Sequence, residues 1–105
     1  MSEIETIFRE RYNDYYVVVQ KFNDGKFGVL VFPHNSNTGQ LVESVITEHH
    51  ALKGAEKVHI FYDIAISKGY RLDNGYFRNA NGHNVHGSFA MDLDADPVRF
   101  TNLFS

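Results

Sequence analysis

Six histidines in a chain of 105 residues are the first feature that could carry chemistry. Apart from the adjacent pair His49-His50, the closest spacing is that of His83 and His86, which follow the Asn81-Gly82 turn. Two imidazoles hold Zn²⁺ only together with a third ligand, for which Asp92 is the nearest candidate. A strand points alternate residues to opposite faces, so we expect the two imidazoles to diverge. The sequence therefore predicts surface histidines, with no bound metal and no cofactor.

Combinations of serine, histidine and aspartate also suggest hydrolytic chemistry. His86, Ser88 and Asp92 share one face of a predicted strand, but neighbours on such a face stand about 7 Å apart. His59 and Asp63 share a face of another predicted strand, at a separation of about 13 Å. A catalytic triad needs both of its contacts near hydrogen-bond length. We therefore expect no catalytic set and predict that the protein is not an enzyme.

A basic and aromatic hairpin is predicted around the turn Asn74-Gly75. In it Arg71 lies opposite Arg78, and like charges that face each other across strands are destabilising. Two guanidiniums beside aromatic rings would suit a phosphate, a nucleic-acid backbone or an acidic protein surface. The simpler interpretation is that Asp73 and solvent relieve the repulsion. The expected partner-binding residues are Tyr70, Arg71, Tyr76 and Arg78, followed by Lys57, His59 and Phe61 on the strand expected there.

Composition excludes several classes of protein. With 10 basic and 13 acidic residues the net charge is −3, which argues against a protein held on nucleic acid by bulk positive charge. The chain has no cysteine, so it has no disulfide framework and no thiolate site. No apolar run approaches the roughly 20 residues that cross a membrane, and the first residues are acidic, unlike a signal peptide. We expect a cytoplasmic protein without membrane contact.

The strongest local signal is a β-hairpin. Two β-branched and aromatic runs, at 15–22 and 27–32, flank Asp24-Gly25, a pair typical of a two-residue turn. That turn would place Val19 opposite Leu30. Both faces of the hairpin are then apolar, so we expect the hairpin to be central in its sheet or covered on both sides.

The other elements complete an α+β fold. Leu41, Val42, Val45, Ile46 and Leu52 suggest one apolar helix face, so the main helix is predicted at 39–53. The remaining expected elements are a short helix at 3–12, a strand at 56–67, two short strands around the Asn74-Gly75 turn, a strand at 84–93 and a short helix that begins at Asp96-Pro97. The fold class that we predict is a two-layer sandwich in a single domain, residues 1–105: a mainly antiparallel sheet of about five strands with the 39–53 helix packed on it and short terminal helices.

Three functions are compatible with these features. The first is a small protein-binding module without enzymatic activity, an inhibitor, immunity or host-takeover protein of the phage or mobile-element type that blocks a partner protein; tyrosine and arginine are favoured at such interfaces. The second is a nucleic-acid or nucleotide binder that uses the basic and aromatic hairpin at 68–79. The third is a metal protein or hydrolase that depends on His83 and His86. We expect the first, and an exposed sheet edge would also allow a homodimer.

Overall fold

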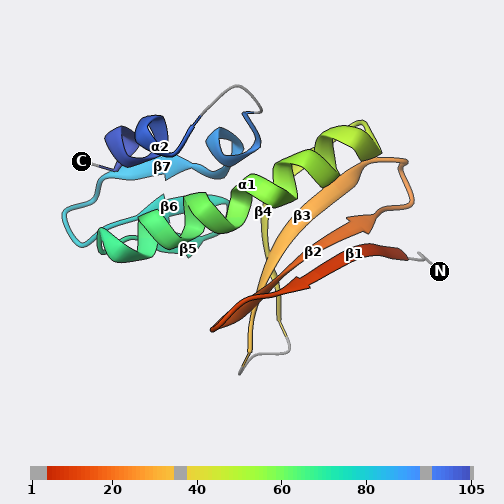
Figure 1. The fold of residues 1–105 in the computed structure, drawn as a ribbon, viewed down its shortest axis with the longest axis horizontal. Helices are drawn as coiled ribbons and strands as arrows, with labels where there is room; N and C mark the ends of the chain where they lie inside the picture. Colours follow the sequence, from red (N-terminus) through yellow and green to blue (C-terminus); the bar gives the residue numbers. More distant parts are fainter. Residues whose placement is uncertain (1–4, 35–37, 93–95, 105) are drawn as a thin grey trace.

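The computed structural model describes residues 5–34, 38–92 and 96–104, whose strands form two antiparallel sheets (Figure 1). The large sheet has the order β1-β2-β3-β4 and the small sheet the order β5-β6-β7. The large sheet consists of β1 (Glu5–Arg11), β2 (Tyr15–Lys21), β3 (Phe27–Pro33) and β4 (Gln40–Val45). The small sheet consists of β5 (Arg71–Asp73), β6 (Tyr76–Arg78) and β7 (Asn84–His86). The helices are α1 (Glu48–Ser67), the 3-10 helix η1 (Gly87–Met91) and α2 (Pro97–Leu103).

Helix α1 joins the two sheets. Its 20 residues make it about 30 Å long, so it reaches from the large sheet to the small one (Figure 1). It packs on β2, β3 and β4 of the large sheet and also on η1 and α2. Phe61 is fully buried, with its ring against Phe77 of β6 and against Phe100 and Phe104 at the C-terminal end. One hydrophobic core therefore holds both sheets on the same helix.

The central hairpin forms as predicted, but its register differs by one residue. Strands β2 and β3 are the two inner strands of the large sheet. Their turn has three residues, because the Phe22 amide donates to the Lys26 carbonyl at 2.9 Å and Gly25 adopts a φ of 86°. Val19 therefore lies opposite Val29 and not opposite Leu30. A one-residue slip exchanges the two faces of a strand, which is why the predicted faces of β3 are reversed.

The predicted helix at 39–53 and the predicted strand at 56–67 are both wrong. Residues 40–45 form β4, and α1 begins after Thr47, whose hydroxyl accepts the His50 amide at 3.2 Å as an N-cap. The helix then continues through Gly54, which had suggested a helix end. At Gly54 the Met91 side chain packs against the helix, with its methyl carbon 2.2 Å from where a Cβ would stand. The buried side of α1 recurs with helical spacing, at Ala51, Gly54, Ala55, Val58, Phe61 and Ala65.

At the two ends of the chain, one prediction is wrong and one is confirmed. The stretch expected to form a helix at 3–12 is strand β1, which pairs with β2 and carries a bulge between Thr6 and Phe8; Ser2, its expected cap, lies outside the described residues. The C-terminal helix begins as predicted. The Asp96 carboxylate accepts the Arg99 amide at 2.9 Å, and Pro97 is the first helical residue.

The fold is thus α+β and mainly antiparallel, but it is not a single five-stranded sandwich. The predicted strand at 84–93 ends at His86, where the chain turns into η1, and residue 93 lies outside the described part. The described strands divide into two sheets. The large sheet packs on α1 through β2, β3 and β4, and the small sheet meets α1 where Phe77 of β6 contacts Phe61. Of the helices that the structure describes, none combines the length and the apolar character of a membrane span.

Candidate functional site

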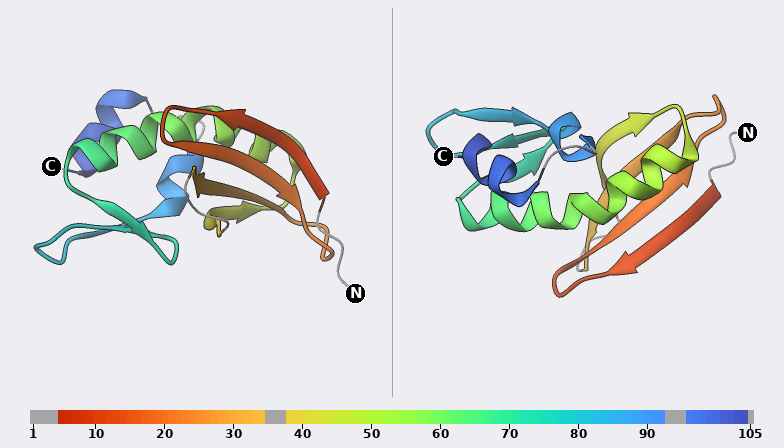
Figure 2. Two further views of the ribbon diagram at one scale, coloured as in Figure 1. Left: turned by 90° about the horizontal axis from the view of Figure 1, so that it is seen from below. Right: turned by 45° about the horizontal axis from the view of Figure 1, so that its top comes forward.

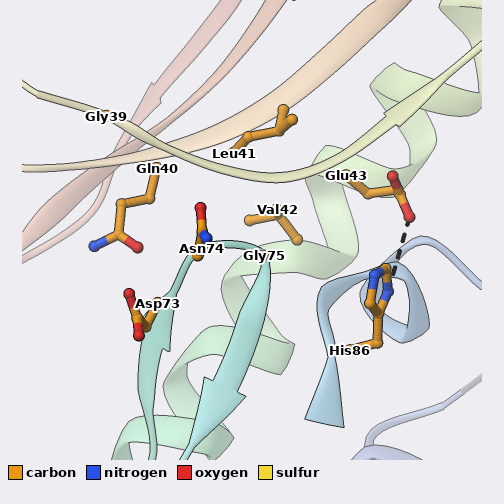
Figure 3. Close-up of a pocket in the computed structure, with 9 residues that line it drawn as sticks. All are labelled: Gly39, Gln40, Leu41, Val42, Glu43, Asp73, Asn74, Gly75 and His86. Atoms are coloured by element: carbon orange, nitrogen blue, oxygen red, sulfur yellow. Dashed lines mark ion pairs between the residues drawn. The ribbon is translucent and has the colours of Figure 1, made fainter. Parts of the chain in front are cut away.

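A crevice of about 510 Å³ lies where the free edge of the large sheet meets the small sheet (Figure 3). Strand β4 forms one wall and the turn between β5 and β6 forms the other. Gln40 and Asp73 lie at one end, and Glu43 and His86 at the other. The full lining is Gly39, Gln40, Leu41, Val42, Glu43, Asp73, Asn74, Gly75 and His86. Most of these groups are polar, so the crevice suits a polar ligand.

The wall formed by β4 is an unpaired sheet edge. Strand β4 pairs with β3 on one side only. Within the described residues, no backbone hydrogen bond joins β4 to any strand other than β3. Alternate amides and carbonyls of an edge strand point outward, and an extended chain can pair with those of β4 apart from the Val42 carbonyl, which lies against Gly87.

The opposite wall is held in place by its turn geometry. Asn74 has a φ of 56° and Gly75 a φ of 85°, as in the two-residue turn that the sequence predicts. Behind the turn, the Gly87 amide donates to the Gly75 carbonyl at 2.7 Å. A Cβ on Gly87 would lie 2.4 Å from the Val42 carbonyl oxygen, so glycine is required for the two sheets to approach this closely. Backbone atoms therefore fix the width of the crevice.

His86, Glu43 and Ser88 come together beside the crevice. Nδ1 of His86 lies 2.7 Å from the Ser88 hydroxyl and 3.9 Å from a Glu43 carboxylate oxygen. The expected 7 Å separation of His86 and Ser88 is wrong, because the chain leaves the strand at His86 and curls into η1. A triad requires the serine and the carboxylate on opposite ring nitrogens. Here both lie at Nδ1, so this group has the residues of a triad without its geometry.

The carboxylates of the crevice have only distant cationic partners. Nδ1 of His86 accepts the Ser88 amide at 3.1 Å and so caps η1. The same nitrogen lies 3.9 Å from the Glu43 carboxylate, near the limit of an ion pair. Asp73 has a partner only at the limit of an ion pair, with Arg78 Nε at 4.0 Å. The two ends of the crevice therefore carry negative charge.

The expected hairpin surface is present in part. Arg71 lies opposite Arg78 as predicted, and both are exposed. The repulsion is reduced by Asp73 at 4.0 Å from Arg78, and Arg71 donates to the Tyr70 carbonyl at 2.9 Å. Tyr76, 38% exposed, lies on the same outer face and meets the His86 ring edge-on at 4.8 Å. Arg71, Tyr76 and Arg78 thus flank the crevice.

Two of the expected contact residues are buried and cannot reach a partner in this structure. Tyr70 is 2% exposed because its ring packs on Phe104. Phe61, which the sequence places either under a terminal helix or on the surface, packs under α2. Lys57 and His59 lie on α1 and not on a strand, so they are separated from the hairpin residues.

His59 and Asp63 are closer to each other than predicted, since four residues span one turn of a helix and not 13 Å of strand. Both face the start of β2. The Tyr15 hydroxyl donates to Asp63 at 2.8 Å, and the Tyr12 ring stacks on His59 at 4.6 Å. Burial, and then the bond to Asp63, raise the pKa of Tyr15 well above its usual range. Nδ1 of His59 is buried without a hydrogen-bond partner.

The metal candidates do not converge. His83 meets the Tyr70 ring edge-on at 5.8 Å, whereas His86 faces Tyr76 and Glu43 on the outer side of the small sheet. Nowhere in the described ranges do three His, Cys, Asp or Glu side chains lie together as metal ligands would. Glu43 and Gln40 were not expected in any site, because the sequence placed them on a helix.

Comparison of the chain with protein-family models, with curated proteins and with solved structures finds no match in any of the three.

Proposed function

We propose that this protein is a protein-binding module that takes an extended, basic segment of a partner protein into the crevice beside β4. The observation that carries the proposal is an unpaired strand edge that forms one wall of a crevice with carboxylates at both ends. Extended segments bind in this way by adding a strand to a sheet edge, where main-chain hydrogen bonds supply affinity and side-chain pockets supply specificity.

The length of the crevice suits a short segment. Gln40 and Glu43, at its two ends on β4, are three residues apart, which corresponds to about 10 Å of strand. A ligand strand beside β4 therefore places two to four residues between the ends. Asn74 lies between the ends on the opposite wall, where its amide can donate to or accept from a ligand backbone.

Charge defines the chemistry of that segment. The Glu43 carboxylate lies 3.9 Å from His86, and the Asp73 carboxylate lies 4.0 Å from Arg78, both at the limit of an ion pair. Lysine or arginine side chains of the ligand would pair with these two carboxylates. Because the carboxylates are partly exposed, each such pair contributes about 0.2–1 kcal/mol. The two ion pairs therefore give specificity for basic ligands, while hydrogen bonds to the β4 backbone give most of the affinity.

The broader role that we propose is that of a non-enzymatic inhibitor in the cytoplasm, an immunity or host-takeover protein of phage or mobile-element type. Such a protein blocks its partner by occupying one of the partner's segments. Support comes from the position of the crevice at the junction of two sheets that backbone contacts hold together, since a preformed site loses little entropy on binding.

The test is a selection from a library of random peptides of about ten residues displayed on phage, with the purified protein as bait. We expect enrichment of peptides with two basic residues two to four positions apart. A synthetic peptide of the enriched sequence should bind the double variant Glu43→Gln, Asp73→Asn about five- to ten-fold more weakly than the natural protein, as two rim charges predict.

The matched control is Glu56→Gln, which removes an exposed acid of α1 away from the crevice lining. It should leave peptide affinity within two-fold of the natural value. Two results would contradict the proposal: a library that yields no enriched sequence, and an enriched peptide whose affinity is the same for the double variant and for the control.

A further inference from the structure

The large sheet has a second face that the helices of the described chain leave open. Helix α1 packs on the side of Val17, Val19, Val29 and Val31, all at most 1% exposed (Figure 2). Cross-strand partners point to the same face, so the strand pairs define the residues of the other side. This open face consists of Thr6, Arg9, Arg11, Tyr16, Val18, Gln20, Gly28, Leu30, Phe32, Leu41 and Ser44, with His34 at its end.

Three planar groups lie together on the open face, those of Arg9, Tyr16 and His34. The Arg9 guanidinium carbon lies 4.2 Å from the centre of the Tyr16 ring, and the His34 ring lies 4.6 Å from the same ring. Tyr16 thus holds an exposed guanidinium in one orientation. A guanidinium held in this way can stack on a nucleobase with its free face and can donate from its edge to a phosphate.

The charge of the open face is opposite in sign to that of the whole chain. Arg9 and Arg11 lie on it, whereas Glu5 and Glu10 of the same strand pair with Lys21 and Val17 and therefore point to the other side. Among the described residues of the four strands, the open face includes no aspartate and no glutamate. The net charge of −3 therefore hides a local basic surface.

A shallow depression of about 560 Å³ lies beside the Arg9–Tyr16–His34 group. Its lining is Thr6, Arg9, Tyr16, Val18, Gln20, Phe32 and His34. The hydroxyl of Thr6 and the amide of Gln20 are neighbours across β1 and β2 and can read the edge of a base. Val18 is 6% exposed, so it contributes little apolar surface to the depression.

We propose that the open face binds single-stranded nucleic acid. A base stacks beside the Arg9–Tyr16–His34 group, and neighbouring phosphates contact Arg9 and Arg11. Aromatic rings and basic groups on the exposed face of an antiparallel sheet are a general solution for single strands, because every base has a stacking surface. A duplex keeps its bases stacked on each other and cannot use these groups. The depression beside the Arg9–Tyr16–His34 group shares no residue with the crevice lining, so this proposal and the peptide proposal can fail separately.

The experiment is fluorescence anisotropy with labelled oligothymidine and oligouridine of about ten nucleotides. The natural protein should bind single strands, and Arg9→Ala should weaken binding about ten-fold. Tyr16→Leu keeps an apolar side chain but removes the ring, and it should weaken binding by five-fold or more. Arg99→Ala removes the same charge from exposed α2, so as the matched control it should change affinity less than two-fold.

Salt provides a second readout. For single strands the slope of log affinity against log salt is about −0.7 for each phosphate contact, so loss of Arg9 should reduce its magnitude by about 0.7. Circular dichroism establishes that each variant is folded. The proposal is overturned if no oligonucleotide binds at high micromolar protein, if a duplex binds as tightly as a single strand, or if Arg99→Ala weakens binding as much as Arg9→Ala. Equal, Arg9-dependent binding of polyglutamate would also overturn it, because the surface would then accept any polyanion.

Discussion

Gly87→Ala tests whether backbone contact fixes the junction of the two sheets. The added Cβ would lie 2.4 Å from the Val42 carbonyl oxygen and 2.9 Å from that of Gly75. Both are backbone atoms of ordered elements, so about 1 Å of separation between the sheets is needed to reach an ordinary contact. Overpacking of this kind costs about 1–3 kcal/mol. Loss of the 2.7 Å bond from Gly87 to Gly75 adds about 1 kcal/mol.

The expected loss is therefore about 2–4 kcal/mol, which urea unfolding followed by circular dichroism measures. Gly54→Ala is the contrasting variant. Its Cβ meets the flexible end of Met91 at 2.2 Å, and alanine is about 1 kcal/mol better than glycine inside a helix. We expect it to lie within about 1 kcal/mol of the natural protein. The reasoning would be refuted if Gly87→Ala retained full stability, or if the two variants lost the same amount.

Three further outcomes follow from the core, the turn and the buried tyrosine. Phe61→Ala should cost about 3–5 kcal/mol in the same urea assay, because the Phe61 ring fills the space between α1 and α2. Asn74→Ala should cost about 1–2 kcal/mol, since alanine resists the φ of 56°; Asn74→Gly should not. Burial and the bond to Asp63 raise the pKa of Tyr15 above the ordinary value of 10.0, so the folded state retains a proton that the unfolded state loses. Stability from this group is therefore complete below pH 10 and declines as the pH rises further, and Tyr15→Phe should flatten the decline measured by urea unfolding at alkaline pH.

The sequence predicts correctly those turns and helix starts that depend only on residues next to each other in the chain. Asn74-Gly75 forms the two-residue turn because both residues tolerate a positive φ. Asp96-Pro97 begins a helix because the carboxylate caps it and proline needs no amide partner at that position. These features are determined by nearest neighbours along the chain.

Between residues 39 and 67 the sequence predicts a helix followed by a strand, whereas the structure has strand β4 followed by helix α1. This error has a physical cause. Val58, Ile60, Ile64 and Ile66 have β-branched side chains and alternate with polar residues, which is typical of a strand. The same stretch also carries small residues at helical spacing, Ala51, Gly54, Ala55 and Ala65, which let α1 approach the sheet and η1 closely. Packing against these elements decided between the two patterns, and it is not visible in one segment alone.

The candidate site was missed because it depends on this part of the fold. Gln40 and Glu43 form a crevice wall only when 40–45 is an edge strand. The signal that could have indicated it is the position of this short apolar run between Gly39 and the Thr47-Glu48 helix start, since a strand of six residues fits there. The hairpin that carries Arg71, Tyr76 and Arg78 forms as predicted because its turn is local, and the role of these residues in partner binding stays a prediction.

In the function that we propose, an extended basic segment pairs with the free edge of β4. An NMR titration of isotope-labelled protein with the basic peptide from the library selection, combined with amide hydrogen exchange, observes this pairing residue by residue. We expect the amide signals of residues 40–43 and 73–75 to shift and exchange to slow at outward-facing amides of β4. Shifts confined to the open face around Arg9 and Tyr16, or unchanged exchange along β4 at saturating peptide, would contradict it.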